Sequence, residues 1–441
     1  MSRVDRPQRV IVAGGGVAAL ELCLALRAFA GERVHITLIA PEPYFVHRPV
    51  DERDPLAVRR LTRVSVARVV RGAADDLRRD RLAAVDPAPR LVHTAVGHEL
   101  AYDALVVAVG AVPQAVPAGA EPFDRAHTAG CRDVLRDLVR GELTSVAFVV
   151  PPAPTHAFDV YDLALEAAVA VRREDADATL TLVTAEPGPL ALLGRRASAT
   201  LHVTLGAHGL RVVDSAYVRS IGQGHMHLAP LSRRLAAERV IAAPRLAGPE
   251  LAHLQCDADG FLPVDPLGRV TGVPGVFAAG DCTSFPVKHP SLTAQQADAV
   301  ASTIAAEAGA RVEAVPFEPV LRGMLPSRLR WYVEAPLTGG HGDATRVSAL
   351  PLWSPPLRFH ARFLGASLQR EARWTSPGSV ETTHSVRQSE RMEPRSAALS
   401  VRPWPSGLAR RPPPSHSSTA STSSRAGTSR SPAAREPTSA S

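Results

Sequence analysis

The sequence has a single lysine, Lys288, among its 50 basic residues. It also has only four cysteines, which stand far apart and form no C-x-x-C pair. That spacing argues against a disulfide framework and against a zinc site, and it is typical of proteins from a reducing compartment. No stretch reaches the roughly 18 apolar residues that a membrane span needs, and the N-terminus has no signal-peptide core. We therefore expect a cytoplasmic protein.

The formal net charge of +7 does not by itself indicate nucleic-acid binding. The excess of arginine lies after residue 370, in a Ser/Pro/Arg-rich stretch with few large apolar side chains. Such a stretch buries too little surface to offset the entropy of ordering, so we predict a disordered tail over residues 371–441. An out-of-frame reading of a GC-rich gene would give the same composition, and that alternative stays open. No nucleic-acid partner is expected.

Residues 9–310 alternate between β-branched apolar runs and helical segments, as in "RVIVAGGG", "VHITLIAPE", "ALVVAVGA", "SVAFVVPP" and "TLTLVTAE". This alternation predicts an α/β fold with parallel sheets wound by helices. Residues 311–370 differ, because they indicate short strands and one amphipathic helix. We expect them to form a small C-terminal unit.

The first apolar run leads directly into the glycines of Gly14-x-Gly16-x-x-Ala19 and then into an apolar helix. This context is typical of a dinucleotide-binding turn. Gly14 permits the tight turn, Gly16 lets the backbone approach a pyrophosphate, and Ala19 keeps the helix close to the strand. The helix N-terminus would then offer N–H groups to the phosphates.

The strand "VHITLIAPE" should end in an acid that binds a ribose hydroxyl. Ala40 occupies the usual position, and Glu42 is the nearest carboxylate. Either Glu42 binds the ribose or a backbone group replaces it.

Two further strand ends complete the pattern. "ELAYDALVVAVGAVP" carries Gly110, and "TGVPGVFAAGDCTSFP" ends at Gly280-Asp281. With the first turn, these stretches resemble the two-dinucleotide-domain flavoproteins, the pyridine nucleotide-disulfide oxidoreductase superfamily. The resemblance implies two Rossmann-like domains that bind FAD and NAD(P), with Asp281 on the ribityl chain of FAD. A helix N-cap is the alternative role for Asp281.

The resemblance also implies domain boundaries. The FAD-binding domain would be formed by two segments, with the NAD(P)-binding-like domain between them. The expected divisions are 1–113 and 245–310 for the FAD-binding domain, 114–244 for the NAD(P)-binding-like domain, 311–370 for the C-terminal unit and 371–441 for the tail.

Over residues 9–360 the chain is most similar to the branch that contains type II NADH dehydrogenases and sulfide:quinone oxidoreductases. In that branch the residues after Gly-Asp line the isoalloxazine and the quinone side, which makes Lys288, His289, Gln295 and Gln296 candidates. Lys288 would be catalytic by stabilising the anionic reduced ring. Chance survival of one lysine and ordinary solvation of the glutamines are the alternatives.

The segment "PEPYFVHRPV" follows the second strand of the first domain. By the same resemblance it reaches the flavin ring from the opposite side, with Tyr44, His47, Arg48 and Pro49 as candidate contacts. An ordinary aromatic turn would have the same sequence.

The redox cysteine pair of the disulfide reductases is missing. Cys23 stands alone on the first helix, so reduction through such a pair is excluded, and we expect a buried apolar thiol there. Sulfide oxidation also needs reactive cysteines over the flavin. Cys131 and Cys282 are candidates only by default, which makes a sulfide:quinone role a minority interpretation.

The second domain departs from the family at its glycine turn. After "SVAFVV" the chain reads Pro151-Pro152-Ala153-Pro154-Thr155-His156 instead of G-x-G-x-x-G. Three prolines remove three N–H donors from the turn that should hold a pyrophosphate. The sequence therefore argues against NAD(P)H binding in the usual pose.

These observations favour an FAD-dependent oxidoreductase similar to type II NADH dehydrogenases. It would move electrons from a small-molecule donor, with NAD(P)H as one candidate, to a quinone or similar acceptor. A non-catalytic FAD-binding module or sensor is the alternative. Arg358, Phe359, Arg362 and Phe363 would either touch the inner face of a membrane peripherally or cover the protein's own core.

Overall fold

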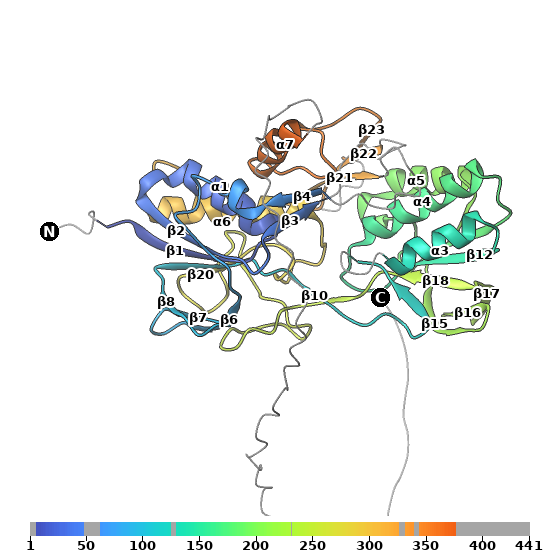
Figure 1. Cartoon of the computed structure of the whole chain (residues 1–441), viewed down its shortest axis with the longest axis horizontal. Coiled ribbons are helices and arrows are strands. Elements are labelled where there is room, and N and C mark those ends of the chain that lie inside the picture. Colours follow the sequence, from blue (N-terminus) through green and yellow to red (C-terminus); the bar gives the residue numbers. More distant parts are fainter. Residues whose placement is uncertain are drawn as a thin grey trace, which may run out of the picture. The chain divides into compact units, whose positions relative to one another are not determined.

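The computed structural model describes residues 6–47, 62–124, 129–230, 232–325, 331–338 and 344–375. Two five-stranded parallel sheets form the two halves of the described chain (Figure 1). The first has the strand order β20-β9-β1-β2-β5. Its strands are β1 (Gln8–Ala13), β2 (Val34–Ile39), β5 (Asp76–Arg78), β9 (Ala104–Val107) and β20 (Val276–Ala278).

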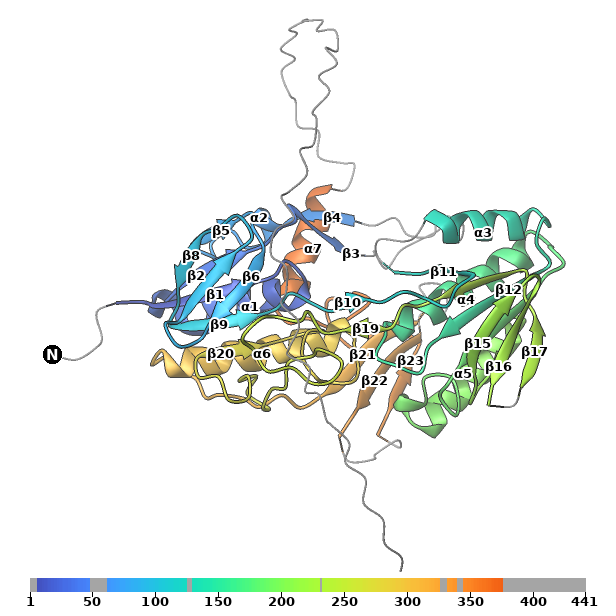
Figure 2. The same cartoon turned by 90° about the horizontal axis from the view of Figure 1, so that it is seen from below.

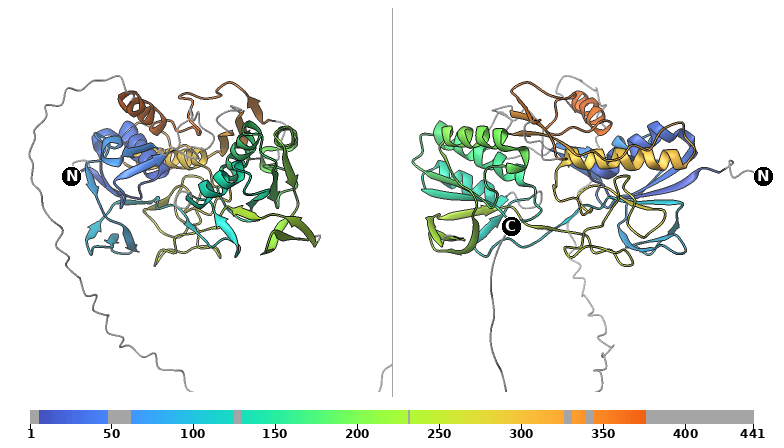
Figure 3. Two further views of the ribbon diagram at one scale, coloured as in Figure 1. Left: turned by 45° about the vertical axis from the view of Figure 1, so that its right-hand side comes forward. Right: turned by 180° about the vertical axis from the view of Figure 1, so that it is seen from behind.

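Alternating side chains give this sheet two buried faces. Val10 and Val12 of β1 face α1 (Val17–Ala30) and α6 (Pro290–Glu307), whereas Ile11 and Ala13 belong to a second cluster on the other side. The period of two follows from the pleat of a strand. Figure 3 shows α1 and α6 side by side on one face. Each fully buried valine or leucine in such a cluster contributes roughly 1.5–3 kcal/mol.

Smaller elements surround this first sheet. An antiparallel three-stranded sheet, β6 (Leu82–Asp86), β7 (Leu91–Thr94) and β8 (Glu99–Ala101), contributes to the second cluster. The chain also forms a short antiparallel pair and a helical turn. These are β3 (Tyr44–His47), β4 (Thr62–Ser65) and α2 (Val66–Val69), with a 3₁₀ turn at Gly31–Arg33.

The second parallel sheet has the order β11-β18-β12-β13-β14. Every residue of its central strand β12 is buried, as expected for a strand covered on both faces. Helices cover one face and an antiparallel sheet covers the other. The elements are β11 (Ala120–Pro122), α3 (Ala129–Val139), β12 (Ser145–Val150), α4 (Ala157–Arg173), β13 (Thr179–Thr184), a 3₁₀ turn (Ala191–Leu193), α5 (Arg195–Ala207), β14 (Leu210–Val213), β15 (Tyr217–Gly222), β16 (His225–Ala229), β17 (Arg233–Ala236) and β18 (Arg239–Ala242).

The chain passes between the two sheets twice. The two passages, β10 (Val112–Pro113) and β19 (Leu246–Ala247), pair with each other in antiparallel register (Figure 2). The parallel sheets and the two-passage connection confirm the predicted fold class of two Rossmann-like domains.

The C-terminal unit consists of an antiparallel sheet and a helix, as predicted. Its elements are β21 (Val320–Leu325), β22 (Trp331–Pro336), β23 (Arg346–Ser348) and α7 (Leu364–Thr375). The helix continues past residue 370, where the sequence alone indicated the start of the tail. Leu364 and Leu368 pack one turn apart into the core of the first domain, and beyond them the Glu371 carboxylate accepts a hydrogen bond from Arg68 at 3.0 Å. The rest of the predicted tail, 376–441, lies outside the described residues.

The aromatic and basic residues before α7 cover the protein's own core. Phe359 is buried, and the ring of Phe363 meets the ring of Phe29 edge-on with centroids 5.6 Å apart. The guanidinium of Arg362 lies over both rings, at 5.7 and 5.0 Å. Of the two alternatives for this segment, these contacts favour packing against the first domain.

A buried carboxylate anchors the start of α7. Glu21 of α1 accepts hydrogen bonds from the backbone N–H groups of Phe363 and Leu364, at 2.9 and 2.5 Å. These donors precede or begin the helix and have no intrahelical acceptor. The contact ties the C-terminal helix to the first domain.

Candidate functional site

The first glycine turn leaves an open space above the start of α1. The N–H of Gly14 donates to the carbonyl of Ile39, and Gly14 has φ +136°. A Cβ on Gly14 would lie 2.1 Å from the carbonyl oxygen of Ala108, so only glycine fits there. A Cβ on Gly16 would meet nothing within 4 Å. Ala19 is fully buried where the helix packs on the sheet.

The Gly280-Asp281 turn meets the same space from the end of β20. Gly280 has φ +88°, and its N–H donates to Oε1 of Gln296 at 2.7 Å. Asp281 accepts a hydrogen bond from the Thr293 hydroxyl at 3.4 Å and lies 2.9 Å from Nε2 of His156. Asp281 does not cap α6, because His289 is the N-cap of that helix.

These turns line one cavity of about 470 Å³, which we call the glycine cavity. It brings together the ends of β1, β9 and β20, as the carboxyl ends of parallel strands should at a switch point of the strand order. A glycine cradle with an acid at its edge fits the diphosphate and ribityl parts of FAD. Its lining includes Gly16, Val17, Gly110, His156, Asp281 and Pro290.

A second cavity shares Val17, His156 and Pro290 with the glycine cavity. We call it the histidine cavity, because His47, His156 and His289 line it. It is narrow, about 110 Å³. Its other lining residues include Phe45, Phe158, Asp159, Asp162, Lys288, Met324, Arg358 and Phe359.

Lys288 is buried at the wall of the histidine cavity. Its Nζ donates to the carbonyl of Thr283 at 2.6 Å and lies 4.0 Å from the centre of the Phe261 ring. Burial lowers the pKa of Lys288 to about 8, partly offset by the negative charge of Asp281. The ammonium is therefore close to titrating at physiological pH.

His289 is buried and begins α6. Its side chain accepts a hydrogen bond from the Ser291 N–H, and its ring lies 4.9 Å from that of Phe158. Burial lowers the pKa of His289 to about 4, so the imidazole is neutral at physiological pH.

Of the candidate flavin contacts and the candidate ribose ligand that follow β2, only some of the described ones lie at a cavity. His47 lines the histidine cavity, whereas Tyr44 is exposed. Glu42 is exposed, and its backbone carbonyl accepts a hydrogen bond from Arg79. Arg48 and Pro49 lie outside the described residues.

The two glutamines of α6 hold protein groups. Gln296 accepts from Gly280 and donates to the Thr283 hydroxyl at 3.2 Å, so it supports the turn that carries Asp281. Gln295 donates to the carbonyls of Ser291 and Val320. The helix begins five residues before Gln295, at Pro290, because proline is favoured in a first helical turn.

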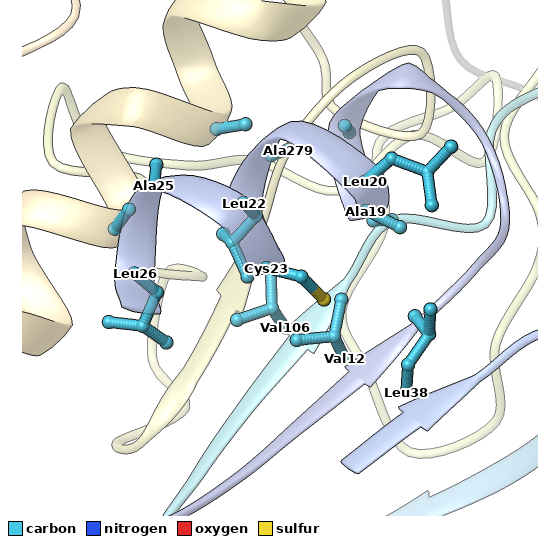
Figure 4. Packing of buried hydrophobic residues seen from close by; sticks show 14 of the residues in the cluster. Val12, Ala19, Leu20, Leu22, Cys23, Ala25, Leu26, Leu38, Val106 and Ala279 are labelled. Atoms are coloured by element: carbon cyan, nitrogen blue, oxygen red, sulfur yellow. The ribbon is translucent and has the colours of Figure 1, made fainter. Parts of the chain in front are cut away.

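Three of the four cysteines are buried and poorly suited to redox chemistry, and the fourth, Cys256, lines neither the glycine cavity nor the histidine cavity. Figure 4 shows the Cys23 thiol pointing onto the sheet between α1 and the strands of Val12 and Val106, as expected for a buried apolar residue. Burial raises the pKa of both Cys23 and Cys282 to about 12. Cys131 is also fully buried.

A third cavity, of about 450 Å³, lies at the atypical turn of the second domain. Residues 150–155, Ala157 and Phe158 line it from the end of β12 and the start of α4, and Lys288 closes one side. We call it the proline cavity.

Sequence reasoning did not assign several residues of the histidine cavity to the site, among them His156, Phe158 and Arg358. His156, Phe158 and Arg358 line the histidine cavity, and Arg358 forms a buried ion pair with Asp162. The position of His156 just before the second-domain helix was the available signal. Nothing in the sequence around Arg358 indicates that it reaches α4.

Comparisons with known proteins place this arrangement in a family. The sequence matches the family described as pyridine nucleotide-disulphide oxidoreductase over residues 1–121 and 162–308. No curated protein matches the chain at the sequence level. The helices of the described part of the chain include none with the length and hydropathy of a transmembrane span.

Solved structures share the fold at low identity. The sulfide:quinone oxidoreductase of Aquifex aeolicus is 18% identical, with a TM-score of 0.66, over 83% of this chain and 91% of that one. A ferredoxin reductase of Rhodopseudomonas palustris is 18% identical, with a TM-score of 0.54, over 74% and 88%. NDH2 of Plasmodium falciparum, solved with NADH, is 19% identical, with a TM-score of 0.51, over 63% and 65%. The family match covers more than half of the chain, and the protein therefore belongs to the pyridine nucleotide-disulphide oxidoreductase family and is an FAD-dependent oxidoreductase.

Proposed function

We propose that this flavoprotein passes electrons from a small reduced donor through FAD to a quinone or similar acceptor, in the manner of type II NADH dehydrogenases. One observation carries the proposal: the glycine and histidine cavities meet at Val17, His156 and Pro290. A dinucleotide held at one end by the glycine turns would direct its ring end toward the wall formed by Lys288 and His289. The N-terminus of α6 also begins there and favours negative charge.

Each residue would have a distinct part in this arrangement. Gly14, Gly16 and Ala19 form the turn for the diphosphate, Gly110 borders it, and Gly280 presents Asp281 to the ribityl chain. FAD, when bound, supplies the electron-transfer chemistry. Lys288 would provide positive charge near the ring, and Gln296 would act indirectly by holding the turn of Asp281. Glu42 and Tyr44 would act only at the outer edge of the site.

The residues of the site say least about the identity of the electron donor. The proline turn does not favour a nicotinamide nucleotide in the usual pose, although NDH2 of Plasmodium falciparum was solved with NADH. Sulfide is disfavoured by the buried cysteines, despite the fold shared with a sulfide:quinone oxidoreductase. A peripheral contact with an inner membrane face would suit a quinone acceptor, but the residues named for it, Arg358, Phe359, Arg362 and Phe363, pack against the protein itself.

The altered second turn also favours a second candidate, a non-catalytic FAD-binding sensor. One anaerobic experiment separates the two. The purified FAD-loaded chain is mixed in turn with NADH, NADPH and sulfide, and the visible flavin bands are followed. We expect one donor to bleach the bands and a quinone analogue to restore them. If no donor acts, and the dithionite-reduced protein is not reoxidised by the quinone, the sensor is correct.

A further inference from the structure

The proline cavity occupies the position at which the second Rossmann-like domain would bind a dinucleotide. It lies at the carboxyl end of β12 and the start of α4, where such domains hold a pyrophosphate. Its walls are mostly apolar, formed by Pro151, Pro152, Pro154, Phe158, Leu192 and Val287. The chemistry of these walls determines what class of molecule fits.

The turn itself has few donors for a phosphate. Pro151, Pro152 and Pro154 have no N–H group. The N–H of Ala153 donates to the carbonyl of Pro151 at 2.9 Å, and the hydroxyl of Thr155 donates to the carbonyl of Pro244 at 2.8 Å. Three residues of this turn thus have no N–H for a pyrophosphate, and the N–H of Ala153 and the hydroxyl of Thr155 are used within the protein.

The charges that line the cavity do not favour a pyrophosphate. Glu186 lines the cavity just after β13, and its carboxylate accepts a hydrogen bond from the N–H of Ala191 at 2.5 Å. Lys288 is the one basic side chain among the described residues that line the cavity. The lining therefore has one carboxylate and one ammonium, so it offers no excess of positive charge to a doubly charged ligand.

Two side chains separate the proline cavity from the histidine cavity. Phe158 and Lys288 line both, and the Phe158 ring also lies against His289. The ammonium of Lys288 has three donors, one of which is used by Thr283. A ligand in the proline cavity would thus lie one side-chain layer from the proposed position of the flavin ring.

We propose that the proline cavity binds an uncharged apolar ring with a carbonyl oxygen, that is, a quinone, in place of the dinucleotide. The apolar walls would cover the ring, and Lys288 would face the oxygen. This inference rests on the proposed function, because it names the site of its acceptor. On reduction the quinone takes up two electrons and one proton from the reduced flavin, which becomes oxidised, and a second proton from solvent, giving a hydroquinone.

Isothermal titration of the oxidised, FAD-loaded full chain with a short-chain naphthoquinone tests the site. Ala153→Phe fills the proline cavity without touching the other two, whereas Ala101→Phe adds the same ring at an exposed position of β8. We expect Ala153→Phe to weaken binding about tenfold or more and Ala101→Phe to leave it unchanged. Equal binding by folded Ala153→Phe and the wild type overturns the inference.

A photoreactive azidoquinone gives a second readout that needs no variant. The label should fall on residues 150–155 or 185–192, and excess NADH should not prevent the labelling. Label confined to residues 45–47 or 358–359 places the quinone in the histidine cavity and overturns the inference, while leaving the proposed function intact. Failure to load FAD, or to transfer its electrons to any quinone, overturns the proposed function instead.

Discussion

Nε2 of His156 lies 2.9 Å from Oδ2 of Asp281, so that the start of α4 contacts the turn after β20. The contact lies where the glycine and histidine cavities meet, because His156 lines both. It joins Asp281, which is predicted to bind the ribityl chain, to the proline turn of the second domain, which differs most from the family pattern. The same carboxylate can accept hydrogen bonds from cofactor hydroxyls, so the imidazole and the cofactor share one acceptor group.

Replacing Asp281 tests the predicted ribityl contact. We expect Asp281→Ala to weaken FAD binding about tenfold or more, because a hydrogen bond to a charged group contributes roughly 1.5–3 kcal/mol. Asp177→Ala, at an exposed position, is the control. The measurement is the dissociation constant of FAD from flavin fluorescence. Wild-type affinity in a folded Asp281→Ala protein would remove Asp281 from the site.

Replacing His156 tests whether its imidazole competes with FAD for the Asp281 carboxylate. His156→Ala releases the Asp281 carboxylate, and we expect FAD to bind this variant at least as tightly as the wild type. The same fluorescence titration measures it. If His156→Ala binds FAD as weakly as Asp281→Ala does, then the imidazole positions the carboxylate for the cofactor and no competition exists.

The two glycines of the first turn should respond differently to alanine. In Gly14→Ala the new Cβ would clash with the Ala108 carbonyl at a positive φ, and we expect a loss of roughly 1–3 kcal/mol in the free energy of unfolding. In Gly16→Ala the methyl has open space, so the apoprotein should melt like the wild type while FAD binds more weakly. Melting curves with and without FAD distinguish the two effects. Unchanged FAD affinity in Gly16→Ala would argue against a close diphosphate.

Lys288 should make the flavin potential depend on pH. Because its pKa lies near 8, the ammonium loses its positive charge as pH rises through that value, and stabilisation of the negative reduced ring is then lost. We expect an inflection near pH 8 in the midpoint potential of the wild type and none in Lys288→Met. A purely structural lysine would give a less stable Lys288→Met protein whose potential follows the wild-type pH profile.

The pair Glu21–Asp298 between α1 and α6 should make stability fall as pH rises. Burial, and the charge of Glu21, raise the pKa of Asp298 to about 8, whereas Arg362 opposes the shift. In the unfolded chain the carboxyl ionises near its ordinary pKa of about 4. The folded state therefore holds an extra proton between these values, and the stability this gives is lost as pH approaches 8.

Asp298→Asn removes this titration. We expect its melting temperature to decline less than that of the wild type between mildly acidic pH and pH 8, with Asp177→Asn as the control. If the melting temperature of Asp298→Asn declines with pH as steeply as that of the wild type, other groups set the pH dependence of stability.

The elements that carry local signals could be predicted from the sequence. The glycines at 14 and 16, the apolar run before them and the Gly280-Asp281 strand end each depend on backbone geometry within a few residues. The site beyond them could not be predicted, because its contacts join distant segments. His156 reaches Asp281 across 125 positions, and Arg358 reaches Asp162 across 196.

Local sequence also could not show how the side chains would be used. Gln296 has the position of a cofactor contact, yet both ends of its amide hold the Gly280–Thr283 turn. Glu186 follows β13 where a ribose-binding acid would be expected, yet it accepts from Ala191. Such roles depend on which neighbours the fold supplies.

The most direct test of the account is an absorbance spectrum of the purified full chain after incubation with FAD and removal of the excess. The protein is then reduced with dithionite without oxygen and mixed with a naphthoquinone. The account predicts one bound FAD per chain, whose visible bands disappear on reduction and return with the quinone. A colourless protein, or bands that the quinone does not restore, would contradict it.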